Sequence, residues 1–134
     1  MYLLDTNVIS GLRRARPHGA VVAWLHATPD SRLHVSAVSI GKIQRGIELT
    51  RENDPRRADE LGRWLADVER AWNILPMSSD CFRSWARLMH RRSAVFSEDA
   101  MIAATAIVHR LTVVTRNIRD FEPFGVETLD PFAG

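Results

Sequence analysis

The sequence predicts an α/β domain in which a short parallel sheet is covered by helices on both faces. Short apolar segments at 2–5, 33–36 and 112–115 alternate with longer segments of helical periodicity, as in parallel α/β proteins. The chain has 134 residues, of which 46% are hydrophobic, so it can bury the core of one ordinary domain. Because no linker, repeat or low-complexity tract interrupts the alternation, we expect a single domain over residues 1–134.

The N-terminal segment predicts a strand followed by two helices and a second strand. Residues 2–5 are typical of a buried strand, and residues 7–14 of a short helix whose basic end suits its C-terminal dipole. Pro17 opens a second helix, and a turn at Pro29 closes it. The second strand is expected at 33–36.

The rest of the chain continues this alternation. Isoleucines recur at helical spacing over residues 38–50, and Asp54 followed by Pro55 is a capping signal for a longer helix. That helix has an apolar stripe typical of a core-facing surface: Leu61, Trp64, Leu65, Val68 and Trp72. The remaining predicted elements are a brief strand at 73–77, a helix starting at Ser79, a helix over 98–111 capped by Ser97, and strands at 112–115 and 126–129.

Composition excludes several classes of protein. No apolar stretch is long enough for a membrane span and no signal-peptide layout is present, so we expect a cytoplasmic protein without membrane contact. The lone Cys81 cannot form an intrachain disulfide, and the five histidines lack the paired spacing of a zinc site. The formal charge is +2, with basic clusters at 13–16, 56–57 and 91–92 that either contact phosphate or form solvated helix faces.

Four polar residues follow predicted strands or begin helices in positions that can converge at one end of the sheet: Asp5, Asp99, Asn117 and Asp120. Two ionised carboxylates 5 Å apart repel by about 3 kcal/mol at an effective dielectric constant near 20. They therefore need a cation, and Mg²⁺ fits an all-oxygen site and keeps several waters. Such waters supply the nucleophile for phosphodiester hydrolysis.

Each acid also has a simpler interpretation. Asp5 is a favoured residue for capping the following helix, and Asp99 complements the positive end of a helix dipole. Asp120 can likewise be interpreted as an ordinary turn residue without a catalytic role. No single acid is specific for a catalytic site, so the inference depends on their combination.

In order and spacing, four segments resemble the motifs of VapC-type PIN-domain toxins, the FitB-like branch included: LLDTNVIS at 3–10, VSAVSIGKIQRGI at 35–47, DAMIAATA at 99–106 and TVVTRNIRDF at 112–121. The resemblance implies a three-layer α/β/α PIN domain with Mg²⁺- or Mn²⁺-dependent endoribonuclease activity on RNA. It also implies a cognate antitoxin and assembly as dimers of toxin and antitoxin. A receiver-like phosphoacceptor domain also places an aspartate at a strand end, but the other motifs do not fit it.

By the same resemblance, Asp5 matches the first metal-binding aspartate of the family and Asp99 the later one. The remaining acidic position falls at Asn117 or Asp120. Hydrogen-bonding groups that hold the carboxylates in register are expected at Thr6, Asn7, Ser36 and Thr115.

Lys42 departs from the family pattern. Relatives commonly carry glutamate in the pattern G-E-L-x-x-G-I, and the corresponding run at 41–47 places Lys42 at the glutamate position. An ammonium near Asp5 and Asp99 can satisfy both carboxylates without a metal ion. The hypothesis is that this chain binds divalent cations poorly and cleaves RNA slowly or not at all.

Lys42 admits three explanations: an inactivating change selected because an active toxin kills its producer, a natural degenerate toxin, or a lysine that extends to solvent while Glu48 or Glu98 completes the site.

The alternative function is a non-catalytic PIN module that binds RNA or the antitoxin. Apolar stripes around Trp24, Trp64 and Trp72 predict a homodimer contact and a groove for an amphipathic antitoxin segment. Family antitoxins often insert a basic side chain into the acidic pocket, and Lys42 is expected to imitate that contact from within.

Overall fold

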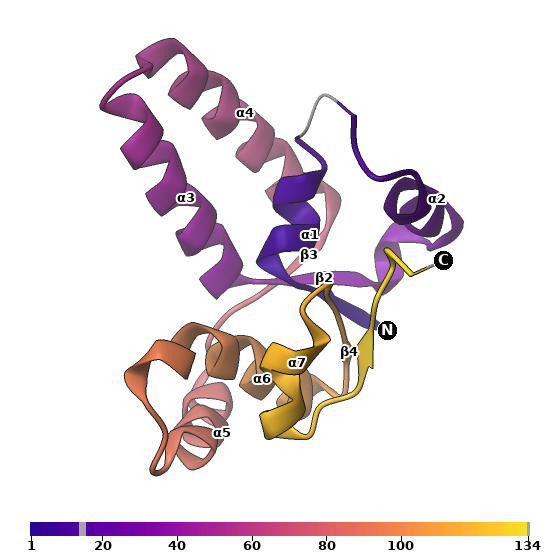
Figure 1. The fold of residues 1–134 in the computed structure, drawn as a ribbon, viewed down its shortest axis with the longest axis vertical. Coiled ribbons are helices and arrows are strands. Elements are labelled where there is room, and N and C mark those ends of the chain that lie inside the picture. The colour runs from indigo at the N-terminus through magenta and orange to yellow at the C-terminus, as the bar shows by residue number, and fades with distance from the viewer. Residues whose placement is uncertain (14–15, 134) are drawn as a thin grey trace.

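The centre of the molecule is a five-stranded parallel sheet (Figure 1). The computed structural model describes residues 1–13 and 16–133. The strands are β1 (Tyr2–Leu4), β2 (Leu33–Ser36), β3 (Asn73–Leu75), β4 (Thr112–Val114) and β5 (Thr128–Leu129). Their order is β3-β2-β1-β4-β5, and every neighbouring pair is parallel. This order confirms the predicted parallel α/β class and puts β1 in the middle of the sheet.

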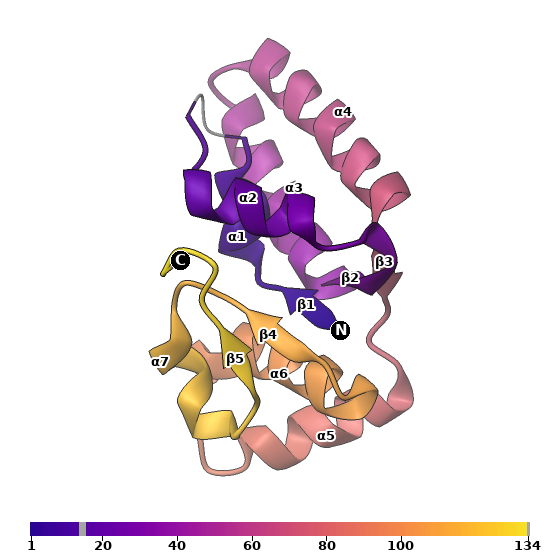
Figure 2. The same ribbon diagram turned by 90° about the vertical axis from the view of Figure 1, so that its right-hand side faces the viewer.

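Helices cover the two faces of the sheet in two groups. They are α1 (Thr6–Gly11), α2 (Gly19–Ala27), α3 (Ala37–Arg51), α4 (Pro55–Ala71), α5 (Ser79–Met89), α6 (Ser97–His109) and α7 (Ile118–Phe121), with short 3₁₀ turns η1 (Asp30–Arg32), η2 (Ala94–Phe96) and η3 (Glu122–Phe124). Figure 2 shows α1 to α4 on one side of the strands and α5 to α7 on the other. Among the described helices, none combines the length and the apolar character that a bilayer span requires.

Two hydrophobic cores form because successive strand residues point to opposite faces. Leu3 and Val113 pack with residues of α6, α7 and η3 on one face. Leu4 and Val114 pack with residues of α1 and α2 on the other. Both faces of the central strands are therefore buried, which explains their continuous apolar sequence.

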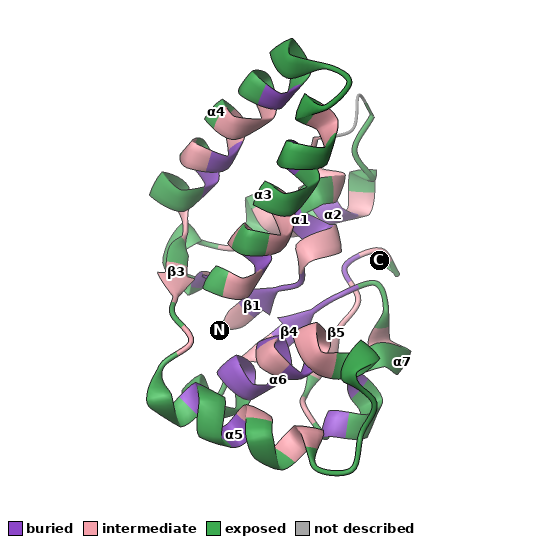
Figure 3. Ribbon diagram, turned by 90° about the vertical axis from the view of Figure 1, so that its left-hand side faces the viewer, coloured by how far each residue is buried: buried purple, intermediate pink, exposed green. Residues whose placement is uncertain are grey.

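Helices α3 and α4 form an antiparallel hairpin that extends beyond the sheet (Figure 1). A side chain caps the N-terminus of each of these helices. Ser36 accepts a hydrogen bond from the backbone N–H of Val38 at the start of α3, and Asp54 accepts one from the backbone N–H of Arg57 at the start of α4. The hairpin has a small core of its own, formed by Ile47, Ala58 and Leu65. Exposed residues line its outer surfaces (Figure 3).

Several element boundaries differ from the sequence expectation. Helix α1 begins at Thr6, because Asp5 caps it, and ends at Gly11; Arg14, the expected end, lies outside the described residues. Ser97 is the first residue of α6 and not its cap. The reason is that η2 runs directly into α6, so Phe96 at the cap position makes no side-chain capping bond.

The segment between β4 and β5 contains α7 and η3, which were not predicted from the sequence. Four residues are too few to show helical periodicity. The segment is nevertheless part of the core, since Phe121 is fully buried and Phe124 is only 6% exposed. The burial of these two aromatic side chains thereby anchors the segment that carries Asn117 and Asp120.

We expect Phe121→Ala to lower the free energy of unfolding by about 3–5 kcal/mol, the usual loss for truncating a buried phenylalanine. Urea denaturation followed by circular dichroism measures the change. Leu49→Ala is the control, because Leu49 is 60% exposed on α3 and should lose less than about 1 kcal/mol. Equal losses from the two variants would contradict the assignment of Phe121 to the core.

Candidate active site

A cavity of about 400 Å³ opens at the carboxyl ends of β1 and β4. Its lining consists of Asp5, Thr6, Asn7, Ser10, Lys42, Asp99, Asn117 and Asp120. Strand order reverses between β1 and β4, and ligands of open α/β sheets bind at such switch points. The structure therefore brings together all five residues for which the sequence suggested a direct role in the site.

Asp5 occupies the innermost position of this cavity. Only 5% of the surface of this residue is exposed to solvent. Oδ1 accepts a hydrogen bond from the Thr6 backbone N–H at 2.8 Å, and Oδ2 accepts one from Thr115 Oγ1 at 2.8 Å. Asp5 thus caps α1 and faces the cavity at once, so the two interpretations drawn from the sequence are compatible.

Burial raises the pKa of Asp5, and repulsion from Asp120 adds to this effect. The hydrogen bonds from Thr115 and Thr6, together with the Lys42 ammonium, oppose the increase. The net increase shows that the surroundings of Asp5 do not fully compensate its charge.

Asp99 lies in the first turn of α6 and is half-buried. Burial raises the pKa of Asp99 most, and repulsion from Asp5 is the next largest cause. Lys42 opposes this increase, while weaker repulsion from Asp120 and Glu98 adds to it. Asp5, Asp99 and Asp120 therefore interact as one acidic cluster. This cluster keeps surplus negative charge even with a lysine beside it.

Thr115 connects the acidic cluster to the loop after β4. Its hydroxyl is fully buried, donates to Asp5 and accepts a hydrogen bond from the backbone N–H of Asn117 at 3.0 Å. Asn117 occupies the cap position of α7, and Asp120 follows within that helix. One hydroxyl thereby fixes the relative positions of Asp5 and the Asn117–Asp120 segment.

The other expected hydrogen-bonding residues are arranged differently. The Thr6 hydroxyl donates to Ser39 at 2.8 Å and links α1 to α3, while the Ser36 hydroxyl caps α3. Asn7 Oδ1 is buried, and no hydrogen-bond partner for it occurs within the described residues. Asn7, which is among the residues that line the cavity, therefore has an unused acceptor oxygen.

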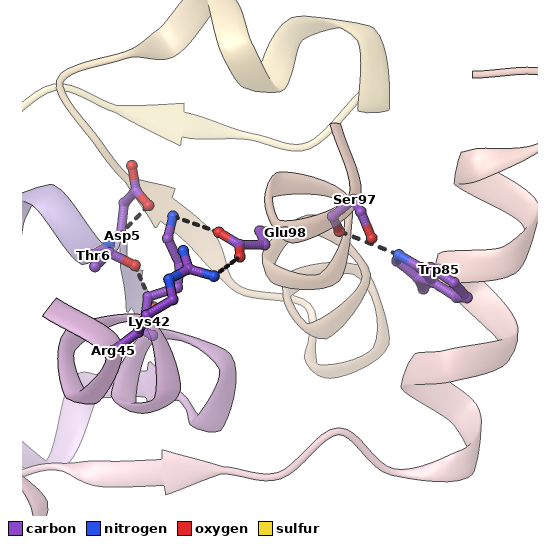
Figure 4. Close-up of polar contacts among 8 residues, drawn as sticks. Asp5, Thr6, Lys42, Arg45, Trp85, Ser97 and Glu98 are labelled. Carbon is purple, nitrogen blue, oxygen red and sulfur yellow. Dashed lines mark hydrogen bonds and ion pairs between the residues drawn. The ribbon is translucent and has the colours of Figure 1, made fainter. Parts of the chain in front are cut away.

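Lys42 contacts Glu98, contrary to the expectation that its ammonium would satisfy Asp5 and Asp99. Its Nζ lies 3.4 Å from Glu98 Oε2, and Arg45 Nη1 lies 3.0 Å from Glu98 Oε1 (Figure 4). The hydrogen bond from Arg45 and the proximity of Lys42 lower the pKa of Glu98. Lys42 therefore does not imitate an inserted antitoxin side chain, although its charge is still felt by both aspartates.

Glu48, the other acid considered for completing the site, lies elsewhere on α3. It is hydrogen-bonded to Gln44 and paired with Arg51, and it does not line the cavity.

Three residues of the site were not predicted from the sequence: Ser10, Ser39 and Arg45. Ser10 lines the cavity, Ser39 accepts the hydrogen bond from Thr6, and Arg45 holds Glu98. Helical spacing could have identified them, since Ser10 follows Asn7 by three residues and Lys42 lies three residues from both Ser39 and Arg45.

The donor set suits a hard divalent cation. All candidate ligands are carboxylate or amide oxygens, the raised pKa values of Asp5 and Asp99 indicate uncompensated charge, and Asn7 has an unused acceptor. Within residues 1–13 and 16–133, however, no group of three or more His, Cys, Asp or Glu side chains is arranged to hold a metal ion. Asp5 and Asp99 would therefore hold an ion together with amide oxygens and water.

Residues 2–124 match the protein family described as PIN domain. The chain is 34% identical over 138 residues to VapC ribonuclease Y4jK of Sinorhizobium fredii, with 98% of each chain covered. It is 31% identical over 140 residues to toxin FitB of Neisseria gonorrhoeae, covering 98% of this chain and 99% of FitB. The crystal structure of FitAcB from the same organism superposes with a TM-score of 0.87 at 30% identity, covering 98% of this chain and 99% of that one.

We expect Asp99→Asn to stabilise the metal-free protein at pH 7. The native pKa of Asp99 lies above its unfolded value, so ionisation opposes folding, and the wild type regains stability as the pH falls through the native pKa. Each unit of that difference is worth about 1.4 kcal/mol. Thermal unfolding in EDTA should show a Tm a few degrees higher at pH 7, and this gain should shrink as the pH is lowered towards about 4, the unfolded pKa of an aspartate.

The control is Asp67→Asn, which removes an acid whose side chain is 71% exposed on α4 and should hardly change Tm. A gain from Asp99→Asn that is equal at both pH values, or a loss of stability at pH 7, would contradict the proposed repulsion.

Proposed function

This chain belongs to the PIN-domain family, and on that premise we propose that it is the toxin of a toxin–antitoxin pair. Its proposed activity is metal-dependent endoribonucleolytic hydrolysis of RNA phosphodiester bonds. The observation that supports this best is the single cavity that gathers Asp5, Asp99, Asn117 and Asp120 at the switch point of the sheet. A toxin that cleaves RNA would meet its substrate in the cytoplasm.

In this proposal Asp5 and Asp99 would hold Mg²⁺ or Mn²⁺, with the Asn117 amide oxygen as a further ligand, because Asp5, Asp99 and Asp120 are not arranged as a three-carboxylate metal site. The bound ion supplies an activated water and stabilises charge that develops on the phosphate. The protein contributes orientation: Thr115 and the Thr6 backbone fix both oxygens of Asp5, so that the carboxylate cannot rotate.

Lys42 is proposed to impair this copy of the enzyme. Its charge opposes the increase that burial causes in the pKa of both Asp5 and Asp99, which means that it favours their ionised forms and competes with a cation for the same role. The pairing with Glu98 reduces this competition without removing it. We therefore propose weak metal binding and slow cleavage.

The proposed antitoxin site is a groove of about 350 Å³ next to the catalytic cavity, lined by α1, α3 and α4. Its wall includes Ile43, Leu61 and Trp64, which suit the apolar face of an amphipathic segment. Arg13 lies over the Trp64 ring at 5.6 Å and adds positive charge. These features favour an amphipathic segment that also carries acidic side chains.

The chain is further proposed to form a homodimer, although not through all of the expected surface. Trp24, Trp64 and Trp72 are half-buried and pack against the core. Large exposed apolar side chains instead occur on α5 and α6, at Phe82 and Ile107, and these helices offer the more suitable contact.

The second candidate function is a non-catalytic module that binds RNA or the antitoxin through the same fold. The lysine at the family's glutamate position is the observation that favours it. Cleavage assays separate it from the enzyme.

We expect Lys42→Glu to raise cleavage of structured RNA at least tenfold over the wild type in Mg²⁺, because it removes a competing cation and restores an acid; a tenfold change corresponds to about 1.4 kcal/mol. EDTA should abolish the gain. The double variant Lys42→Glu/Asp5→Asn is the control for contaminating nuclease and should be inactive. No cleavage by either the wild type or Lys42→Glu on a broad set of RNAs would favour the binding-only module.

We expect Gly46→Leu to weaken antitoxin binding at least tenfold, or about 1.4 kcal/mol. Gly46 lines the groove, and a side chain there meets open space, so leucine fills the groove while favouring the helix. Isothermal titration calorimetry with the antitoxin measures the change. Gly62→Leu on α4 also meets open space but lies outside the groove lining, and it should bind normally. Equal affinities of the two variants would place the antitoxin elsewhere.

A further inference from the structure

The ion pair between Lys42 and Glu98 joins the second turn of α3 to the first turn of α6 (Figure 4). We propose that Glu98 is a positioning residue that holds the Lys42 ammonium away from Asp5 and Asp99 and so leaves these carboxylates available to a divalent cation. This inference rests on the proposed function, because it concerns the same metal site.

The positions of Glu98 and Asp99 on α6 separate their tasks. Consecutive helical residues point about 100° apart. Asp99 accordingly lines the cavity, whereas Glu98 reaches α3 and meets the two cations Lys42 and Arg45. One turn of α6 therefore contributes one acid to the proposed metal site and another to the lysine beside it.

Arg45 makes Glu98 a fixed partner for Lys42. It donates to Glu98 Oε1 at 3.0 Å, while Lys42 lies against the other carboxylate oxygen, Oε2. With one oxygen held by Arg45, the other remains directed at Lys42. The lysine thus meets a carboxylate that a second basic side chain also contacts.

The charges in and around the cavity agree with this division. The pairing of Lys42 with Glu98 cancels one positive and one negative charge and leaves Asp5, Asp99 and Asp120 without a direct cationic partner among the described residues. Because Lys42 already lines the cavity, a short movement of its flexible stem would bring the ammonium to the aspartates if Glu98 were neutral.

A double-mutant cycle tests whether Glu98 acts through Lys42. Mn²⁺ affinity, measured by electron paramagnetic resonance without RNA, should fall about tenfold in Glu98→Gln. In a Lys42→Met background the same change should cost less than about threefold, since there is no ammonium to release. An equal loss in both backgrounds would overturn the inference and make Glu98 a direct contributor to ion binding.

Glu48→Gln is the matched control. It removes an acid from α3 that pairs with Arg51 outside the cavity, so Mn²⁺ affinity should stay within about twofold of wild type if only the Lys42 partner matters. A loss equal to that of Glu98→Gln would mean that overall charge, and not the position of Lys42, sets the affinity.

A crystal structure of metal-free Glu98→Gln tests the same inference without any metal. The Lys42 Nζ should lie within about 4 Å of a carboxylate oxygen of Asp5 or Asp99, the usual salt-bridge limit. An unchanged lysine position would overturn the inference. If none of the variants binds Mn²⁺, the metal site of the proposed function fails, and this crystal structure still decides the role of Glu98.

Discussion

The buried carboxylate of Asp5 is the constraint on which the other features of the site depend. A charge at this depth is costly unless donors surround it, and Asp5 receives one hydrogen bond from the start of α1 and one from Thr115. Thr115 reaches Asp5 because β1 and β4 are paired, with Leu4 opposite Val114. The sheet order, the start of α1 and the loop that carries Asn117 are therefore fixed relative to a single side chain.

The acidic cluster lowers the stability of the folded chain but favours the binding of a cation in the cavity. Burial and mutual repulsion raise the pKa values of Asp5 and Asp99, so their ionised forms make the folded chain less stable than neutral side chains would. The same repulsion favours any cation that enters the cavity. Phe121 and Phe124 hold the neighbouring loop in the core and keep the acids together despite this repulsion. Stability supplied by the core thus permits an unfavourable arrangement at the site.

The sequence was informative where the signal was local or followed from a topological rule. The strand at 33–36 was predicted residue for residue, because a buried apolar strand between turn signals has a clear pattern. The convergence of Asp5, Asn117 and Asp120 followed from the rule that parallel strands expose their carboxyl ends at one edge. The α7 segment was missed because one helical turn has no periodicity, and Ser97 was misassigned because a 3₁₀ turn had already started the helix.

The contact of Lys42 could not be predicted from the sequence, since it depends on how two helices face each other. A lysine beside three aspartates suggests direct neutralisation when only the residue types are known. In the structure Lys42 and Arg45 share a face of α3 that meets the first turn of α6, and Glu98 is the acid that this turn presents to them. The effect of a charge reversal in an active site therefore depends on its nearest partner as much as on its sign. Here that partner leaves Asp5 and Asp99 influenced by the lysine but not bound to it.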